Sequence, residues 1–114
     1  MTKEILIKDL SELDPVPTSH NAGLKQILLA NAETATNITQ IAKSRLAAGE
    51  VATSHAHQDM EECFFFLSGF GSMVIDGNTF DIKKNRFFRI PYGHSHEITA
   101  LSDLSFITIG IAIP

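Results

Sequence analysis

The chain has 114 residues, of which 44% are hydrophobic and 19% charged, and its formal net charge is −4 at pH 7. The length is that of one domain, and the composition is typical of a soluble globular protein rather than a disordered one. No basic patch stands out, so we expect neither nucleic acid nor a membrane as a partner. Cys63 is the single cysteine, which excludes an intrachain disulfide and is compatible with a reducing compartment. The first residues contain no signal-peptide core, and we expect a cytoplasmic protein.

The N-terminal part predicts a strand, a loop and a second strand. Residues 3–8, KEILIK, alternate apolar and charged side chains and predict a short edge strand. Residues 11–23 carry two prolines and a glycine and predict a loop. Residues 24–30 predict the next strand, although the alanines of residues 24–35 leave a helix possible.

The remainder of the chain predicts short strands separated by turns. After a strand within residues 37–50, the apolar runs are VATSHAH, ECFFFLSG, SMVID, TFDIK, RFFRIP, HEITAL and LSFITIGIAIP. Turn signals occur at Asp76-Gly77, Lys84-Asn85 and Ser102-Asp103. About ten strands at this spacing, with no long amphipathic helix, predict an all-β sandwich or barrel.

Two of these strands are apolar on both faces. Phe64 and Phe66 share a face with Glu62, but the odd-numbered positions between residues 63 and 67 are apolar as well. In the last strand, residues 107, 109, 111 and 113 are all isoleucine. An exposed apolar patch of this size is unusual on a soluble monomer, so something must cover it. The N-terminal strand could do so, and a second copy of the chain, forming a homodimer, is our prediction.

Several side chains indicate metal chemistry. His55 and His57 stand at i and i+2 of an extended segment, so both point to the same face. Glu62 is an even-numbered position, so in one continuous strand it would point to the opposite face from His55 and His57. A turn over residues 58–60 is needed to bring it to the same cation. A corner containing proline and glycine brings in His96. Three imidazoles and a carboxylate form a plausible site for a divalent transition metal.

At these residues the chain resembles the cupin superfamily. The spacing of Gly49, His55, His57, Glu62 and Gly69 matches the first cupin motif in type and position throughout. This segment, residues 49–69, is specific because so many positions agree.

Residues 85–100 resemble the second cupin motif, with Pro91, Gly93 and His96 in place. Asn85 stands where the motif has its first glycine, a mild change because asparagine tolerates a left-handed turn conformation. Ala100 replaces the terminal asparagine of the motif, which is not a metal ligand.

The resemblance implies a single all-β cupin domain over residues 1–114, a double-stranded β-helix or jelly-roll barrel. Residues 1–22 would form an N-terminal strand extension and loop, and residues 23–114 the barrel. The implied metal ligands are His55, His57, Glu62 and His96. Two alternatives stay open. Glu61 fits a shorter motif spacing, and His94 has the same i, i+2 relation to His96 as His55 has to His57.

The resemblance also suggests a function. One divalent transition metal per subunit (Mn, Fe, Ni, Zn or Co) would take a small, oxygen-rich molecule such as a sugar, hydroxy acid or enediol. The expected activity is metal-dependent isomerisation or epimerisation by Lewis-acid catalysis, or O₂-dependent dioxygenation. The candidate catalytic side chains are Lys43, Arg45, Tyr92 and His94. The alternative is a non-catalytic module that binds or senses a small molecule.

Overall fold

The computed structural model describes residues 4–19 and 22–114 and is almost entirely β. Two short 3₁₀ helices, η1 (Leu10–Glu12) and η2 (Asn31–Glu33), interrupt the N-terminal half. The strands of the described residues are β1 (Val16–Pro17), β2 (Leu24–Ala30), β3 (Ile38–Leu46), β4 (Val51–His55), β5 (Met60–Ser68), β6 (Gly71–Ile75), β7 (Asn78–Ile82), β8 (Phe87–Ile90), β9 (His96–Ala100) and β10 (Leu104–Ala112).

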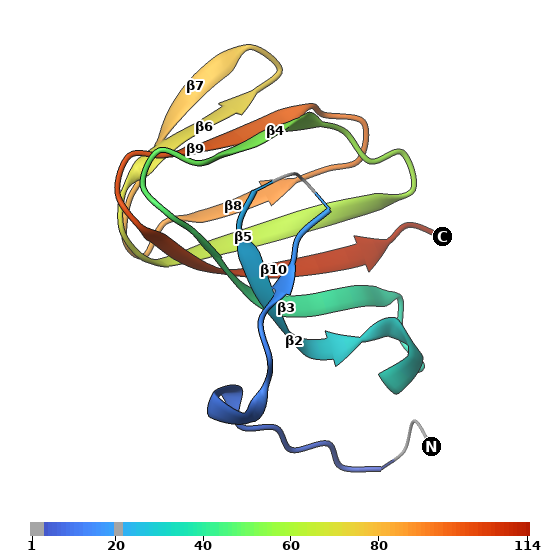
Figure 1. The fold of residues 1–114 in the computed structure, drawn as a ribbon. Helices are drawn as coiled ribbons and strands as arrows, with labels where there is room; N and C mark the ends of the chain where they lie inside the picture. Colours follow the sequence, from blue (N-terminus) through green and yellow to red (C-terminus); the bar gives the residue numbers. More distant parts are fainter. Residues whose placement is uncertain (1–3, 20–21) are drawn as a thin grey trace.

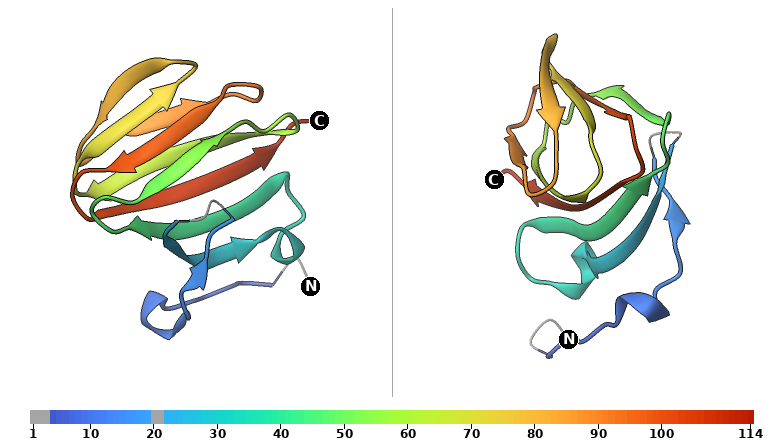
Figure 2. Two further views of the ribbon diagram at one scale, coloured as in Figure 1. Left: turned by 45° about the horizontal axis from the view of Figure 1, so that its top comes forward. Right: turned by 90° about the vertical axis from the view of Figure 1, so that its left-hand side faces the viewer.

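The strands form two antiparallel sheets that face each other. The larger sheet has six strands in the order β1-β2-β3-β10-β5-β8, and the smaller has four in the order β4-β9-β6-β7. Seen from one end, the two sheets enclose a ring of strands (Figure 1, Figure 2). This arrangement confirms the predicted all-β jelly-roll barrel. Among the described residues, no helix has the length and apolar character that a membrane crossing requires.

The core fills the ring because apolar residues alternate along the strands. In β5, Phe64 is 4% exposed and Phe66 is fully buried, whereas Phe65 between them is 38% exposed. The same alternation runs through β9 and the first half of β10. The buried apolar cluster comprises Leu46, Ala52, Phe64, Phe66, Met73, Ile82, Ile90, Ile98, Ala100, Leu104 and Phe106.

Turns expected from the sequence have the predicted backbone conformation. Asp76 (φ 49°) and Gly77 (φ 82°) form the two-residue connection between β6 and β7. Asn85 has a φ of 70°, so it adopts the left-handed conformation that a glycine would otherwise supply. Gly69 follows β5, and a Cβ atom there would lie 2.1 Å from the carbonyl oxygen of Asp103. This contact explains the glycine at the end of the first motif.

The N-terminal prediction was wrong. Of the strand expected over residues 3–8, Lys3 lies outside the described residues, and residues 4–8 form no strand. Ile5 is 90% and Ile7 84% exposed, so the alternating pattern finds no sheet to join within this chain. An ion pair of 2.8 Å between Lys8 and Glu33 of η2 holds the segment beside the barrel. The loop predicted over residues 11–23 contains the short strand β1, which pairs with β2.

Candidate metal centre

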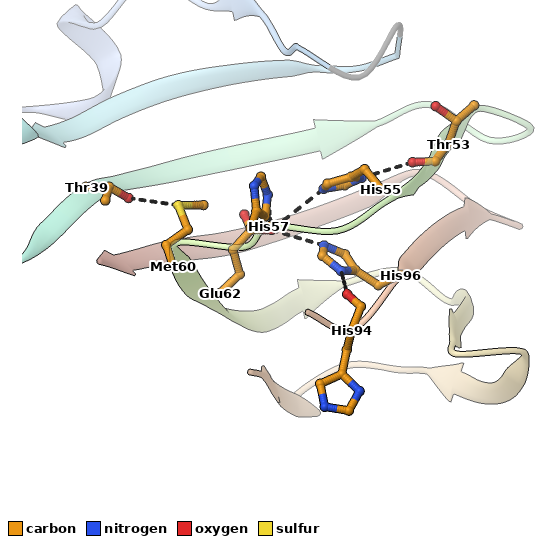
Figure 3. A network of polar contacts seen from close by, with 8 residues as sticks. All are labelled: Thr39, Thr53, His55, His57, Met60, Glu62, His94 and His96. Carbon is orange, nitrogen blue, oxygen red and sulfur yellow. Dashed lines mark hydrogen bonds and ion pairs between the residues drawn. The ribbon is translucent and has the colours of Figure 1, made fainter. Parts of the chain in front are cut away.

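The four side chains that the motifs single out converge at one end of the barrel. β4 ends at His55, the chain continues to His57, and β5 then brings in Glu62. His55 is the register partner of His96, the first residue of β9. One potential ligand atom from each of the four residues lies within 4.8 Å of all the others (Figure 3). This group can therefore hold a metal ion.

The distances within the group fit a single cation. Glu62 Oε1 lies 3.0 Å from His96 Nε2, 3.1 Å from His57 Nε2 and 3.7 Å from His55 Nε2. With metal–ligand bonds of about 2.1 Å, ligand atoms are about 3.0 Å apart at right angles and about 3.4 Å apart at the tetrahedral angle. His57 Nε2 is buried but makes no hydrogen bond of acceptable geometry among the described residues. A ring nitrogen buried in this way is suited to a metal.

Backbone carbonyls orient two of the imidazoles. His55 Nδ1 lies 3.0 Å from the carbonyl oxygen of Thr53, and His96 Nδ1 lies 3.3 Å from that of His94. Because a carbonyl only accepts, each Nδ1 carries the proton and donates it. Nε2 is therefore the nitrogen that can offer its lone pair when a metal binds, an arrangement typical of metal-binding histidines.

The group is electrostatically coupled in the metal-free protein. Burial acts to raise the pKa of Glu62, but hydrogen bonds from His55 and His96 and the nearby charge of His57 outweigh it and hold that pKa far below its ordinary value. The hydrogen bond with Glu62 raises the pKa of His55, and the carbonyl of Thr53 adds to this while burial opposes it. Glu62 is therefore a carboxylate, the form that binds a metal.

The structure does not bring the alternative ligands into this group. Glu61 points to the opposite face of β5, where Arg89 Nε lies 3.2 Å from its carboxylate. The ring of His94 is turned away from the group (Figure 3) and contacts the carboxylate of Asp76 instead. Only the backbone carbonyl of His94 serves the site, through His96.

Three of the candidate catalytic side chains also lie away from the group. Tyr92 is 54% exposed and does not line the cavity beside it. Lys43 and Arg45 flank the buried Ser44 and therefore project from the opposite face of β3. Lys43 does not line that cavity, and Arg45 belongs to its lining but is exposed.

The sequence reasoning missed two polar residues that border the cavity. Lys25 of β2 and Gln40 of β3 line it together with Glu62 and Thr108. The signal that could have found them is the pairing of β2 with β3, which places Lys25 opposite Ser44. It also missed Asp76, whose Oδ1 accepts a hydrogen bond of 3.0 Å from the N–H of Ser95 and so holds the loop before His96.

Fold and site together define a small β-barrel protein with a candidate metal centre at one end. The family model for the cupin domain matches residues 42–110, and the chain belongs to the cupin family. A related protein of Methanocaldococcus jannaschii, itself uncharacterised, is 23% identical over 104 residues, which is 91% of this chain and 82% of the relative.

Solved structures share the fold across nearly the whole chain. A predicted oxalate decarboxylase of Thermotoga maritima superposes with a TM-score of 0.87 at 23% identity, covering 95% of this chain and all of the other. Ectoine synthase of P. lautus gives 0.82 at 17% identity, covering 94% of this chain and 78% of the other. The polyketide cyclase RemF of Streptomyces resistomycificus gives 0.82 at 13% identity, covering 97% and 83%. At these identities the likeness is one of fold.

Proposed function

We propose that the protein is a metal-dependent enzyme that acts on a small oxygen-rich molecule. The observation that carries this proposal is the convergence of three histidine nitrogens and one carboxylate on a cavity inside the barrel. A divalent ion held there would supply Lewis-acid chemistry or, if it is iron, O₂ chemistry. The sugar-like, hydroxy-acid and enediol substrates expected from the sequence all offer oxygen atoms to such a centre.

The residues of this chain have separate tasks in that proposal. His55, His57, Glu62 and His96 would hold the ion. Phe64 packs against the ring of His96, with centroids 5.8 Å apart, and keeps one side of the group dry. A dry wall strengthens the attraction between the centre and a charged or polar ligand.

One observation favours a second candidate, a module that binds a ligand without turning it over. Apart from the four-residue group, the titratable side chains that line the cavity among the described residues are Lys25 and Arg45. Isomerisation or epimerisation needs a group that takes up and returns a proton. Lys25 is the better placed of the two, since Arg45 is exposed and permanently charged.

A turnover assay separates the two candidates. The metal-free protein is loaded in turn with Mn, Fe, Ni, Zn and Co and incubated with hydroxy acids, enediols and aldoses. Products are followed by NMR, and oxygen consumption is measured with an electrode. The enzyme proposal expects turnover in wild type and its loss in His57→Ala. Ligand binding without turnover under any metal would instead support the binding module.

We further propose that the protein is a homodimer. The outer face of the six-stranded sheet carries Phe65 and, in register with it, Ile107, followed by Ile109 beside Cys63. A buried isoleucine contributes about 1.5–3 kcal/mol, so several can outweigh the entropy lost on association. The exposed Ile5 and Ile7 do not cover this face in the single chain. A second copy is the partner that the apolar face supports.

A further inference from the structure

Lys25 extends from β2 into the cavity that the candidate metal centre borders. In register it faces Ser44, which is 7% exposed and points into the barrel. Lys25 lines the cavity on the side where His55 and Phe64 contribute, and also on the side where His57 and Met60 contribute. It therefore lines both cavities that border the metal centre.

The ammonium group of Lys25 has no anionic partner among the described residues. Its Nζ donates a hydrogen bond of 3.1 Å to Gln40 Oε1, and no carboxylate forms an ion pair with it within the described part of the chain. A half-buried cation that is bonded only to a neutral amide remains available to an anion. Gln40 fixes the direction of the ammonium group, since the amide oxygen can only accept.

A cavity lies between Gln40 and the metal centre, and Gly110 forms part of its lining. Glu62 of β5 pairs with Gly110 of β10, which in turn pairs with Gln40 of β3. Two strand spacings separate the Cα atoms of Glu62 and Gln40, which is about 10 Å. A Cβ atom at position 110 would lie 2.2 Å from Thr39 Oγ1, so a larger residue there would have to displace the Thr39 side chain. The gap suits one small ligand lying across β10.

The charges around this gap favour an anionic ligand. A divalent ion with three neutral imidazoles and the Glu62 carboxylate keeps a net charge of about +1. Lys25 adds a second positive charge on the facing wall. Among the described residues that line the cavity, Glu62 is the single acidic side chain. A ligand with two anionic ends would neutralise both positive sites.

We propose that Lys25, held by Gln40, is the specificity-determining residue that binds a distal carboxylate of a substrate whose other end chelates the metal. The ligand class is a small hydroxy- or oxo-dicarboxylate. This inference rests on the proposed metal centre, but it does not require turnover.

The test compares two acids with the same chelating end. The cobalt-loaded wild-type protein is titrated with α-hydroxyglutarate, which has a distal carboxylate, and with α-hydroxyvalerate, in which a methyl group replaces it. Binding is read from the cobalt absorption spectrum. The measured quantity is the preference of wild type for the dicarboxylate divided by that of Lys25→Met, so intrinsic chelation by the two acids cancels. A charge-assisted hydrogen bond predicts a ratio of about 10–100.

Three comparisons make the result decisive. Lys25→Met should bind α-hydroxyvalerate as wild type does, and Lys25→Arg should keep most of the preference because it keeps the charge. Lys43→Met, on the outer face of β3, should be indistinguishable from wild type. An unchanged preference in Lys25→Met, or no preference in wild type, overturns the inference. A preserved preference without any turnover contradicts the enzyme proposal alone, whereas failure to take up cobalt contradicts the metal centre itself.

Discussion

Near the candidate metal centre, the inner and outer faces of β10 differ in a way that reverses the usual pattern. Along β10, Thr108 and Gly110 face inward beside the candidate site, while Ile107 and Ile109 face outward. A sheet of a soluble monomer usually buries its apolar side and exposes its polar side. Here the part of the barrel near the histidines has polar inner positions, and the outer face of β10 is apolar at Ile107 and Ile109.

We attribute each face to a proposed partner. In our proposals a metal ion and an anionic ligand account for the polar interior, because buried polar groups require partners. A second copy of the chain is the proposed cover of the apolar exterior. The two proposals are independent. One substitution can therefore remove the metal without separating the subunits, and another can separate the subunits without removing the metal.

The largest expected effect is on the inner face. His57→Ala removes one of four metal ligands, and we expect the variant to lose its stoichiometric metal while keeping the β-sheet circular dichroism signal. The measurement is elemental analysis of protein purified without an affinity tag. The control is His94→Ala, whose ring contacts Asp76 rather than the group and which should keep a full equivalent. A full equivalent of metal in His57→Ala would contradict the assignment.

Acid should release the metal steeply. Each imidazole must be deprotonated to bind, and the raised pKa of His55 means that its proton competes from above the ordinary histidine pKa of about 6.5. With three histidines competing, metal affinity should fall by up to about a thousand-fold per pH unit well below pH 6. Competition with a chelator between pH 5 and 8 measures this, and a flat profile would rule out a three-histidine site.

In the metal-free protein, acid should have the opposite effect, because protonation of His55 stabilises the folded state. Its pKa is raised in the folded state, so its contribution to the free energy of unfolding is present below the unfolded value of about 6.5. That contribution is lost as the pH rises through the folded pKa. Urea unfolding of the apo protein at several pH values checks the sign, with His55→Gln as the control that should remove this pH dependence.

On the outer face, a charge should separate the subunits without disturbing the site. Ile109→Glu places an unpaired carboxylate in the proposed interface and should weaken the dimer by about 100-fold or more. Light scattering at micromolar concentration should give twice the chain mass of 12.5 kDa for wild type. For the variant it should give the mass of one chain. Phe80→Glu, at an exposed position of β7, is the matched control that should remain dimeric. A wild-type mass of one chain would contradict the dimer.

The smallest effect is expected at Asp76. Its carboxylate holds Ser95 and His94, and through the His94 carbonyl it supports the orientation of His96. Asp76→Asn keeps the shape but weakens this support, so metal affinity should fall by about 10-fold, the lower end for such supporting residues. The neighbouring exposed Asp81→Asn serves as the control. Equal affinity in the two variants would remove Asp76 from the site.

Much of the fold could be predicted because alternation of apolar residues is a local property. It located β2 to β10 and showed that Phe64 and Phe66 share a face with Glu62, as the structure confirms. The same alternation gave a wrong prediction of a strand at residues 4–8, because a strand also needs a neighbour with which to pair. That neighbour is a matter of tertiary structure, which alternation does not encode.

The site was only partly predictable for the same reason. The motif spacing singled out the four converging side chains. Parity showed that Lys43 and Arg45 share a face but not which face lines the barrel, and it made His94 look equivalent to His96 although a loop turns its ring away. The place of Lys25 beside the cavity depends on the pairing of β2 with β3. A local sequence pattern does not predict that pairing.

Anomalous X-ray diffraction from crystals of the untagged, metal-loaded protein, recorded at the absorption edge of the bound metal, tests the central claim most directly. The metal centre predicts one strong peak per chain, about 2.0–2.2 Å from Nε2 of His55, His57 and His96 and from a carboxylate oxygen of Glu62. A peak elsewhere, for example between His94 and Asp76, or no peak at these four residues, would contradict it.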